Sequence, residues 1–199
     1  GVAESDVGAS DARLAADIAG YLFDHLHGRG RVVVVEGPAD SITSQERVAA
    51  FEAAAGRNSG ITIVARSCGA YQRAPARDAF AAVLAAQPQV DAVLAANDIM
   101  AVGVLDALQA AGREAVVVGV NAIPEAIAAI LAGRMLATAD FNAMQMCFLA
   151  TECAIRSLRG EPVPREIELP VAIVDRHNVE RWNLPYDQRP LLTLKEVTA

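Results

Sequence analysis

Hydrophobic and polar residues alternate along the first 142 residues in the pattern of amphipathic helices and buried strands. Short β-branched runs such as RVVVVEG are apolar at consecutive positions, which is typical of strands covered on both faces. Between these runs, apolar residues recur three and four positions apart, which predicts helices. The expected helices are 12–26, 44–56, 74–87, 98–111 and 124–133, and the expected strands are 31–37, 61–67, 91–95, 115–120 and 135–140.

A helix followed by five strand–helix steps predicts an α/β fold, a doubly wound parallel sheet with helices on both faces. The pattern changes after residue 142, where a long helix is predicted at 144–160. Its apolar side chains fall on one stripe, which consists of Met144, Phe148, Ile155 and Leu158. A proline-punctuated connection with one further strand follows. The tail 183–199 has little periodicity, so we expect an extended arm.

Composition and charge exclude several classes of protein. Of the 199 residues, 53% are hydrophobic; the net charge is −7, and no cluster of lysine and arginine indicates binding to nucleic acid. No run of 18 apolar residues predicts a transmembrane helix, and no basic segment followed by an apolar one predicts a secretion signal. The three cysteines have no paired spacing, which argues against a disulfide framework or a zinc site, so we expect no metal.

Sequence motifs of catalysis do not appear. There is no GxGxxG after a strand, no GxxxxGK[ST] phosphate loop and no GxSxG nucleophile turn. Asp98 and Asp140 are carboxylates that could act as an acid and a base, but nothing in the sequence places them together. We therefore expect a binding protein without a cofactor rather than an enzyme.

Polar or aromatic residues follow each of the five predicted strands. The carboxyl ends of parallel strands lie on one edge of a sheet, where ligands of open α/β folds bind. This edge would combine one arginine, two amides and two rings, namely Arg47, Asn97, Asn121, Tyr71 and Phe141. Planar donors and acceptors hold hydroxyl groups, and flat rings pack against C–H faces, so the set predicts binding of a polyol.

Each of these residues also has a simpler structural interpretation, and the residues alone leave both open. An arginine on a helix commonly forms an ion pair, and a loop aromatic such as Tyr71 or Phe141 commonly packs on its own domain. Asn121 suits a turn or the start of a helix. In the pair Asn97-Asp98, either side chain is suited to capping the helix that begins there.

Four segments resemble type I periplasmic binding proteins, the sugar-binding subunits of bacterial ABC importers: VVVVEGPADSITSQERVAAF, PQVDAVLAANDIMAVGVLDALQAAG, VVVGVNAIPEAIAAILAGRMLATADFN and LRGEPVPREIELPVAIV. The resemblance extends over residues 8–178, corresponds to the C-terminal lobe of that family and looks closest to its ribose-type branch. It implies a periplasmic protein that binds a monosaccharide or sugar alcohol between two lobes and delivers it to ABC permease subunits.

The resemblance implies ligand-binding roles for particular residues. Arg47 would clamp ligand hydroxyls, Tyr71 would be the aromatic residue of the loop after the second strand, and Ser10 would be the serine of the hinge. Asn97 would face the ligand, while Asp98 would cap the helix.

Two further ligand-binding positions depart from the family pattern. Asn121 stands where the family usually has an aspartate, and Phe141 stands where it often has a glutamine. Losing a charged acceptor and an amide predicts a ligand that differs from ribose or is less polar than ribose.

The resemblance also implies an organisation into segments. Residues 1–142 and 170–182 would form the ligand-binding lobe, 143–169 would be a helix and crossing segment that pack on an N-terminal lobe, and 183–199 would be the tail. The N-terminal portion would be missing from the chain. The helix 144–160 would then lack its partner, so self-association through this helix or its detachment is expected.

Two alternatives share the predicted architecture. The effector-binding domain of lactose-repressor-type regulators has the same fold, although the short link GREAVVVGV is more typical of a transporter subunit. An enzyme of Rossmann-like or flavodoxin-like fold is the third option, and the lack of phosphate-binding loops argues against it.

Overall fold

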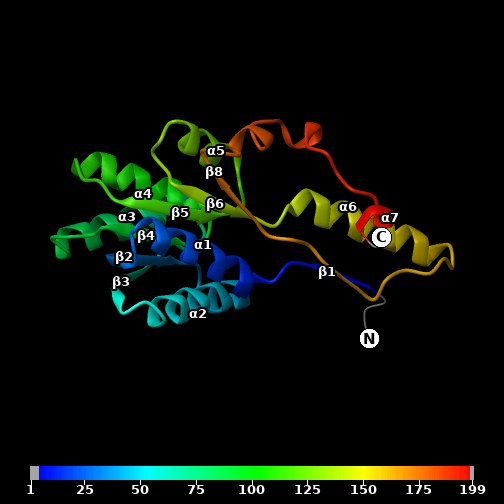
Figure 1. Cartoon of the computed structure of the whole chain (residues 1–199), viewed down its shortest axis with the longest axis horizontal. Helices are drawn as coiled ribbons and strands as arrows, with labels where there is room; N and C mark the ends of the chain where they lie inside the picture. Colours follow the sequence, from blue (N-terminus) through cyan, green and yellow to red (C-terminus); the bar gives the residue numbers. More distant parts are fainter. Residues whose placement is uncertain (1–4, 198–199) are drawn as a thin grey trace.

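The β-branched runs form a six-stranded sheet in the computed structural model, which describes residues 5–197 (Figure 1). In their order across the sheet, the strands are β3 (Gly60–Cys68), β2 (Arg29–Glu36), β4 (Ala92–Ala95), β5 (Val116–Val120), β6 (Ala137–Asp140) and β8 (Ala172–Asp175). Neighbouring strands are parallel except β6 and β8, which are antiparallel. The doubly wound α/β sheet predicted from the sequence is confirmed, with an antiparallel edge strand in addition.

Helices cover both faces of this sheet. α1 (Asp11–His25) and α2 (Ile42–Gly56) pack together on one face, whereas α3 (Arg73–Ala86), α4 (Asp98–Ala111) and α5 (Pro124–Leu131) lie on the other. The chain passes from β2 to β3 on one side and then returns to the opposite side of β2 to form β4. The crevice between β2 and β4 is therefore the topological switch point, where open α/β sheets bind ligands beyond the carboxyl ends of their strands.

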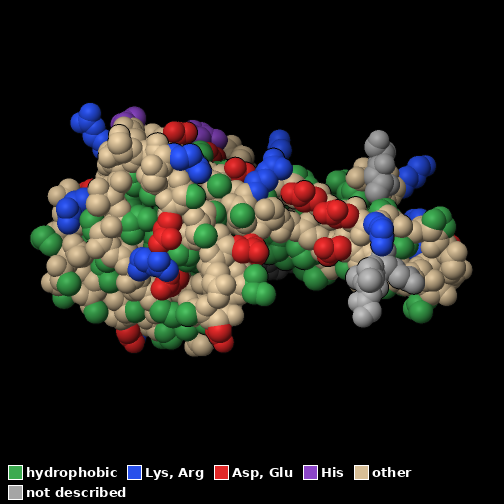
Figure 2. All heavy atoms as spheres, turned by 90° about the horizontal axis from the view of Figure 1, so that it is seen from below, with side chains coloured by type: hydrophobic (Ala, Val, Ile, Leu, Met, Phe, Trp, Pro, Cys, Tyr) green, Lys and Arg blue, Asp and Glu red, His purple; other side chains and the backbone are tan. Residues whose placement is uncertain are grey.

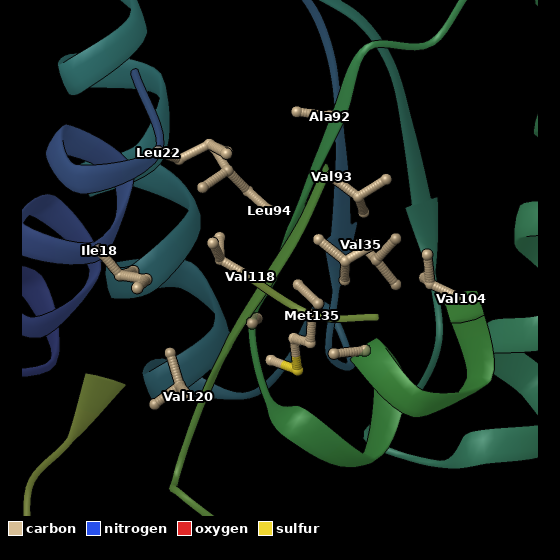
Figure 3. Packing of buried hydrophobic residues seen from close by; sticks show 14 of the residues in the cluster. Ile18, Leu22, Val35, Ala92, Val93, Leu94, Val104, Val118, Val120 and Met135 are labelled. Atoms are coloured by element: carbon tan, nitrogen blue, oxygen red, sulfur yellow. The ribbon is translucent and has the colours of Figure 1, made fainter. Parts of the chain in front are cut away.

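The central strands contribute to two layers of hydrophobic core. Successive side chains of a strand point to opposite faces of the sheet. Leu94 of β4 lies toward Ile18 and Leu22 of α1, whereas Val93 lies on the side of Val104 of α4 (Figure 3). All five side chains are buried. Burial on both faces explains why these strands are unbroken apolar runs in the sequence.

A second, smaller unit forms around α6 (Ala143–Leu158), which projects away from the end of the main sheet (Figure 1). Strands β1 (Asp6–Gly8) and β7 (Glu166–Glu168) pair in parallel, and β1 contacts α6. A separate hydrophobic cluster holds this unit together and consists of Leu149, Cys153, Ile167, Leu169 and Leu194. β1 thus lies with the segment 143–169, although the expected division placed it in the ligand-binding lobe. Residues 1–4 of that expected lobe lie outside the described residues.

Acidic side chains gather where the main sheet joins the smaller unit (Figure 2). β1 and β7 contribute exposed acidic residues to this region, and Asp6 is the register partner of Glu166. Like charges opposite each other disfavour strand pairing. The pairing of β1 with β7 therefore depends on the apolar contacts that these strands make with α6.

The tail after β8 is not the extended arm that we expected. The short helix η1 (Val179–Arg181) precedes residues 183–199, which contain the short helices η2 (Tyr186–Gln188) and α7 (Leu194–Val197). The side chain of Gln145 on α6 exchanges two hydrogen bonds with the backbone of Leu192, both of 2.6 Å. Leu194 N donates to Glu152 Oε2 at 2.9 Å, and the Leu194 side chain is only 3% exposed. The prediction is wrong because isolated anchor residues, without periodicity, attach this segment to α6. Residues 198–199 lie outside the described residues.

The predicted apolar stripe of α6 faces solvent in the described chain. The helix buries Gln145, Leu149 and Cys153 against the smaller unit. The four residues of the stripe lie elsewhere on the helix and are exposed: Met144, Phe148, Ile155 and Leu158. In residues 5–197, no helix has the length and hydropathy needed to cross a membrane.

Candidate ligand-binding edge of the sheet

Backbone strain concentrates at the carboxyl end of the main sheet. Among residues 5–197, six residues other than glycine have a positive φ angle. Five of them follow β3, β5 or β6, namely Ala70, Tyr71, Asn121, Ala122 and Asn142. Such backbone conformations cost on the order of 1–3 kcal/mol each, and they cluster at binding and catalytic sites. This edge is therefore the strongest candidate for a functional surface.

Arg47 lies at the switch point and is 5% exposed. Its Nε and Nη2 atoms are both 2.7 Å from Asp11 Oδ1, and its Nη1 donates to the carbonyl of Ala96 at 2.6 Å. Arg47 thereby joins α1, α2 and the end of β4. The structure contains the ion pair of the simpler interpretation, and contact with a ligand stays a prediction.

Ser10 precedes the carboxylate that pairs with Arg47. It is the N-cap of α1, and its Oγ accepts a hydrogen bond from Arg13 N at 3.2 Å. The capping role is therefore present in the structure. The hinge role that the resemblance implies for Ser10 stays a prediction.

Asn97 and Asp98 differ from their expected roles. Asn97 is the N-cap of α4, and its Oδ1 accepts a hydrogen bond from Met100 N at 2.9 Å. The expectation that Asp98 caps the helix is wrong, because Asp98 is the first residue inside α4 and its side chain is fully buried. Asn97 is half-buried, and its Nδ2 donates no hydrogen bond within residues 5–197. This amide group can still donate to a ligand.

The Asp98 carboxylate connects three parts of the edge. Oδ1 accepts a hydrogen bond from Thr138 Oγ1 of β6 at 2.7 Å, and Oδ2 accepts one from Ile123 N after β5 at 3.1 Å. Burial raises the pKa of Asp98 to about 7, although the two hydrogen bonds act in the opposite direction and the charge of Asp140 raises the pKa further. The carboxylate therefore holds the end of β6 and the turn after β5 against α4.

Asn121 lies in that turn with a φ angle of 116°. Its backbone N donates to Ala139 O at 2.8 Å, which fixes the turn to β6. Its Oδ1 is buried and accepts no hydrogen bond from the described residues. An unpaired buried acceptor costs about 1–3 kcal/mol, so a donor from a ligand would recover that free energy. This is the strongest local indication of ligand contact among the predicted residues.

The two predicted aromatic residues take part in packing at opposite sides of the edge. The Tyr71 ring covers Gly37, where a β-carbon would lie 2.4 Å from the ring atom Cζ. The hydroxyl of Tyr71 is buried without a partner in the described chain. Phe141 is half-buried against the main core. Packing is thus present for both rings, and their contact with a ligand stays a prediction.

Several acidic groups of this edge are buried or paired, whereas Asp40 after β2 and Glu125 after β5 are exposed. Asp140 at the end of β6 accepts a hydrogen bond from Trp182 Nε1 at 2.6 Å. Glu36 at the end of β2 pairs with Arg66 at 2.6 Å. Asp11 pairs with Arg47, and Asp98 of α4 is fully buried. The carboxylates of Asp11, Asp98 and Asp140 are therefore occupied within the protein, whereas Asn97 Nδ2 and Asn121 Oδ1 have no partner in the described chain.

Three residues that organise this edge were not predicted from the sequence: Asp11, Thr138 and Trp182. Asp11 shows one usable signal, since an acidic residue in the first turn of a helix is well placed to pair with a neighbouring helix. Thr138 is one of two buried polar side chains in the predicted strand run ATAD, together with Asp140. Trp182, the one tryptophan of the chain, stands in a polar segment where packing alone would not explain it.

Neither of two shallow hollows on the described surface is lined by a predicted ligand-binding residue, although the second reaches Glu36 and Gly37 at the end of β2. One of about 230 Å³ is lined by residues of α6, β1 and the following loop, including Ala150, Cys153 and Val163. The other, of about 240 Å³, lies beside α2 and includes Val48 and Arg66.

Known proteins match the chain over most of its length. A family profile described as periplasmic binding protein domain matches residues 5–162. A putative rhizopine-binding protein of Rhizobium meliloti is 31% identical over 162 residues, which cover 79% of this chain and 52% of the relative. A D-ribose/D-allose-binding protein of Pseudomonas aeruginosa is 31% identical over 174 residues, covering 84% of this chain and 54% of the relative.

A solved structure has the same architecture. It is a periplasmic solute-binding protein of an ABC transporter from Actinobacillus succinogenes with bound D-allose, with a TM-score of 0.85 and 25% sequence identity. The match covers 88% of this chain and 63% of that structure. The chain spans about half the length of the curated relatives it matches. With residues 5–162 inside the family profile, the chain belongs to the family of periplasmic binding protein domains.

Proposed function

We propose that this chain is the ligand-binding lobe of a solute-binding protein of a bacterial ABC importer, and that it holds a monosaccharide or sugar alcohol against a second lobe. The protein would act in the periplasm, deliver its ligand to permease subunits and catalyse no reaction. The Pseudomonas relative is named for D-ribose and D-allose, and the Actinobacillus structure contains D-allose. These relatives are transport proteins, so the alternative of a transcriptional regulator is not favoured.

One observation supports ligand binding at the edge of the sheet above the others. The buried Oδ1 of Asn121 lacks a hydrogen-bond donor in the described chain, and the turn that carries it is strained. On the same edge, the free Nδ2 of Asn97 supplies donors, and the guanidinium of Arg47 lies at the end of the adjacent strand. Together these groups suit the mixed donor and acceptor character of hydroxyl groups.

The state of the carboxylates supports a neutral ligand. The carboxylates of Asp11, Asp98 and Asp140 are each buried or paired, as with Asp140 and Trp182. A cationic ligand would require a free carboxylate, because burying an unpaired charge is expensive. A sugar or polyol with one apolar face would satisfy the amides and leave Tyr71 and Phe141 to cover its C–H groups.

Calorimetric titration with D-ribose and D-allose tests this proposal. In the protein that carries both lobes, Asn121→Ala should weaken binding about tenfold, because one hydrogen bond is lost at a cost of about 1.4 kcal/mol. Asn58→Ala is the control, since Asn58 lies between α2 and β3 and its side chain donates a hydrogen bond to Ala54 O one turn earlier. The 199-residue chain alone should bind more weakly than about 1 mM, since it supplies one wall of the cleft. Tight binding by the single chain would contradict the two-lobe proposal.

We also propose that the exposed stripe of α6 allows two copies of this chain to associate. Phe148 is 39% exposed and Ile155 is 44% exposed, and contiguous apolar surface of this kind mediates association. Light scattering should show a dimer that Phe148→Glu and Ile155→Glu convert to a monomer. Leu131→Glu is the control, because Leu131 is 45% exposed but lies on α5 of the main unit. A monomeric wild-type chain would reject this proposal.

A further inference from the structure

The turn after β5 is held by side chains that do not belong to it. Asn121 and Ala122 both have positive φ angles, 116° and 50°. The backbone N of Ala122 donates to Thr138 Oγ1 at 3.3 Å, and the N of Ile123 donates to Asp98 Oδ2 at 3.1 Å. Two successive backbone donors of a strained turn are therefore satisfied from β6 and α4.

Asp98 is the centre of this arrangement. It is fully buried, and its other oxygen, Oδ1, accepts the Thr138 hydroxyl at 2.7 Å. A β-carbon at position 119 of β5 would lie 2.3 Å from Oδ1, so the carboxylate requires Gly119 beneath it. Thr138 receives a hydrogen bond from the turn and donates one to Asp98, so the two side chains act as one acceptor unit.

The conformation of this turn determines the position of the Asn121 side-chain amide. A strained non-glycine residue persists only where its surroundings over-determine its conformation. On one side of Asn121, its own N is bonded to Ala139 O, and on the other side the turn is bonded to Asp98 and Thr138. These bonds fix the backbone on both sides of the residue whose Oδ1 lacks a partner in the described chain.

We propose that Asp98, acting with Thr138, is the positioning residue that fixes the Asn121 amide for ligand contact. This inference rests on the proposed function, in which Asn121 contacts the ligand. Asp98 itself is too deeply buried to touch the ligand. Its effect is to remove the alternative conformations of the turn, so that the amide is already oriented when the ligand arrives.

Several charged residues lie near Asp98 and Thr138, and the protonation of Asp98 provides a pH-dependent signal for the experiment. Asp140 lies at the end of β6, Glu125 is exposed in the first turn of α5, and Arg189 of the tail has its Nη1 3.5 Å from Ala122 O. Burial raises the pKa of Asp98 to about 7, so the carboxylate changes protonation near neutral pH. When Asp98 is protonated, the oxygen that carries the proton becomes a poor acceptor for its present donor, Thr138 Oγ1 or Ile123 N, so the chemical shifts of the turn amides should change.

Nuclear magnetic resonance on the 199-residue chain tests the positioning role without a ligand. The backbone amides of Asn121, Ala122 and Ile123 should shift together with a midpoint near pH 7. Asp98→Asn should abolish this titration, whereas Asp106→Asn should not, because Asp106 lies on the same helix but pairs with Arg73 at the surface. Amides of the turn that titrate unchanged in Asp98→Asn would overturn the proposal.

Two variants of Thr138 test the same positioning role while Asp98 stays unchanged. Thr138→Val deletes the hydroxyl at nearly constant volume, and Thr138→Ser retains it. If Thr138 completes the acceptor unit, Thr138→Val should displace the Asn121 amide resonances and Thr138→Ser should leave them close to the wild-type positions. Equal spectra for the two variants would overturn the proposal.

Binding of D-allose by the protein with both lobes supplies the functional readout. Asp98→Asn and Asn121→Ala should each weaken binding about tenfold, and the double variant should be no weaker than either one, because both act through the same amide. Independent, additive losses would assign Asp98 a purely structural role and overturn the proposal. If Asn121→Ala has no effect while Arg47→Ala does, the proposed function stands and the positioning role is rejected.

Discussion

Replacing Arg47 with alanine is expected to lower the free energy of unfolding by about 3 kcal/mol, because it leaves a partly buried carboxylate without its partner. Arg47 bonds Asp11 at 2.7 Å and the carbonyl of Ala96 at 2.6 Å. It joins two helices on one face of the sheet to the end of the central strand β4. Water can reach part of Asp11, whose side chain is 23% exposed, so the loss should lie at the lower end of the range for buried pairs.

Urea unfolding followed by Trp182 fluorescence measures this loss. Arg66→Ala is the matched control, because Arg66 forms two ion pairs of 2.6 Å, with Glu36 and Glu52, but its side chain is 46% exposed. Exposed pairs contribute about 0–1 kcal/mol. If Arg47→Ala costs no more than Arg66→Ala, the proposed structural role of Arg47 is wrong.

Ligand contact and structural support by Arg47 can be separated. Asp11→Asn keeps the guanidinium but weakens its carboxylate partner, so it should reduce stability more than ligand affinity. If Arg47 contacts the ligand as proposed, Arg47→Ala should additionally weaken D-allose binding about tenfold in the protein with both lobes, because a charged donor would be lost. Unchanged affinity for D-allose in folded Arg47→Ala would leave Arg47 with the structural role alone.

Local signals predicted most of the main sheet. The predicted helix at 98–111 matches α4 to the residue, because Asn97 caps its start and Gly112 takes the left-handed C-cap conformation, with φ 60°. Strands such as β2 stand out because a parallel strand is apolar on both faces. Such signals lie within a few residues of the element that they define, so a single sequence contains them.

Contacts between distant residues could not be predicted in this way. That Asn97 rather than Asp98 caps α4 depends on Thr138, which is 40 residues away from Asp98. Both residue types are suited to capping a helix. The hydroxyl group of Thr138 on β6 determines that the Asp98 side chain is the one buried in the core. The ion pair between Asp11 and Arg47 has the same character, since it spans 36 residues.

The smaller unit was harder to predict because its elements are short. β1 and β7 have three residues each, too few for a periodic pattern, and they lie far apart in the sequence. The tail offered no periodicity either. Its attachment depends on the buried Leu194 side chain and on backbone groups of the tail that bond Gln145 and Glu152. Every residue has such backbone groups, so the sequence does not indicate which of them form these bonds.

Leu194→Asp is expected to detach the tail from α6. Leu194 is 3% exposed in a cluster with Leu149 and Cys153. Losing a buried leucine costs roughly 1.5–3 kcal/mol, and placing a carboxylate among apolar side chains adds to this cost. The two hydrogen bonds between Gln145 and Leu192 cannot hold a segment of such low local stability, so hydrogen exchange of residues 192–197 should accelerate at least about tenfold.

Leu192→Asp separates this effect from a general change of charge in the tail. Leu192 is 49% exposed, and its bonds to Gln145 come from its backbone, so the same substitution two residues earlier should leave exchange almost unchanged. In Leu194→Asp, the α6 amides near Leu149 and Cys153 should also lose protection, because the tail covers that side of the helix. The amides of β4 should exchange as in the wild type, since the main core contains none of the residues of this cluster. Equal exchange in the two variants would show that Leu194 does not anchor the tail, and the hydrogen bonds of Gln145 and Glu152 would then have to account for its attachment.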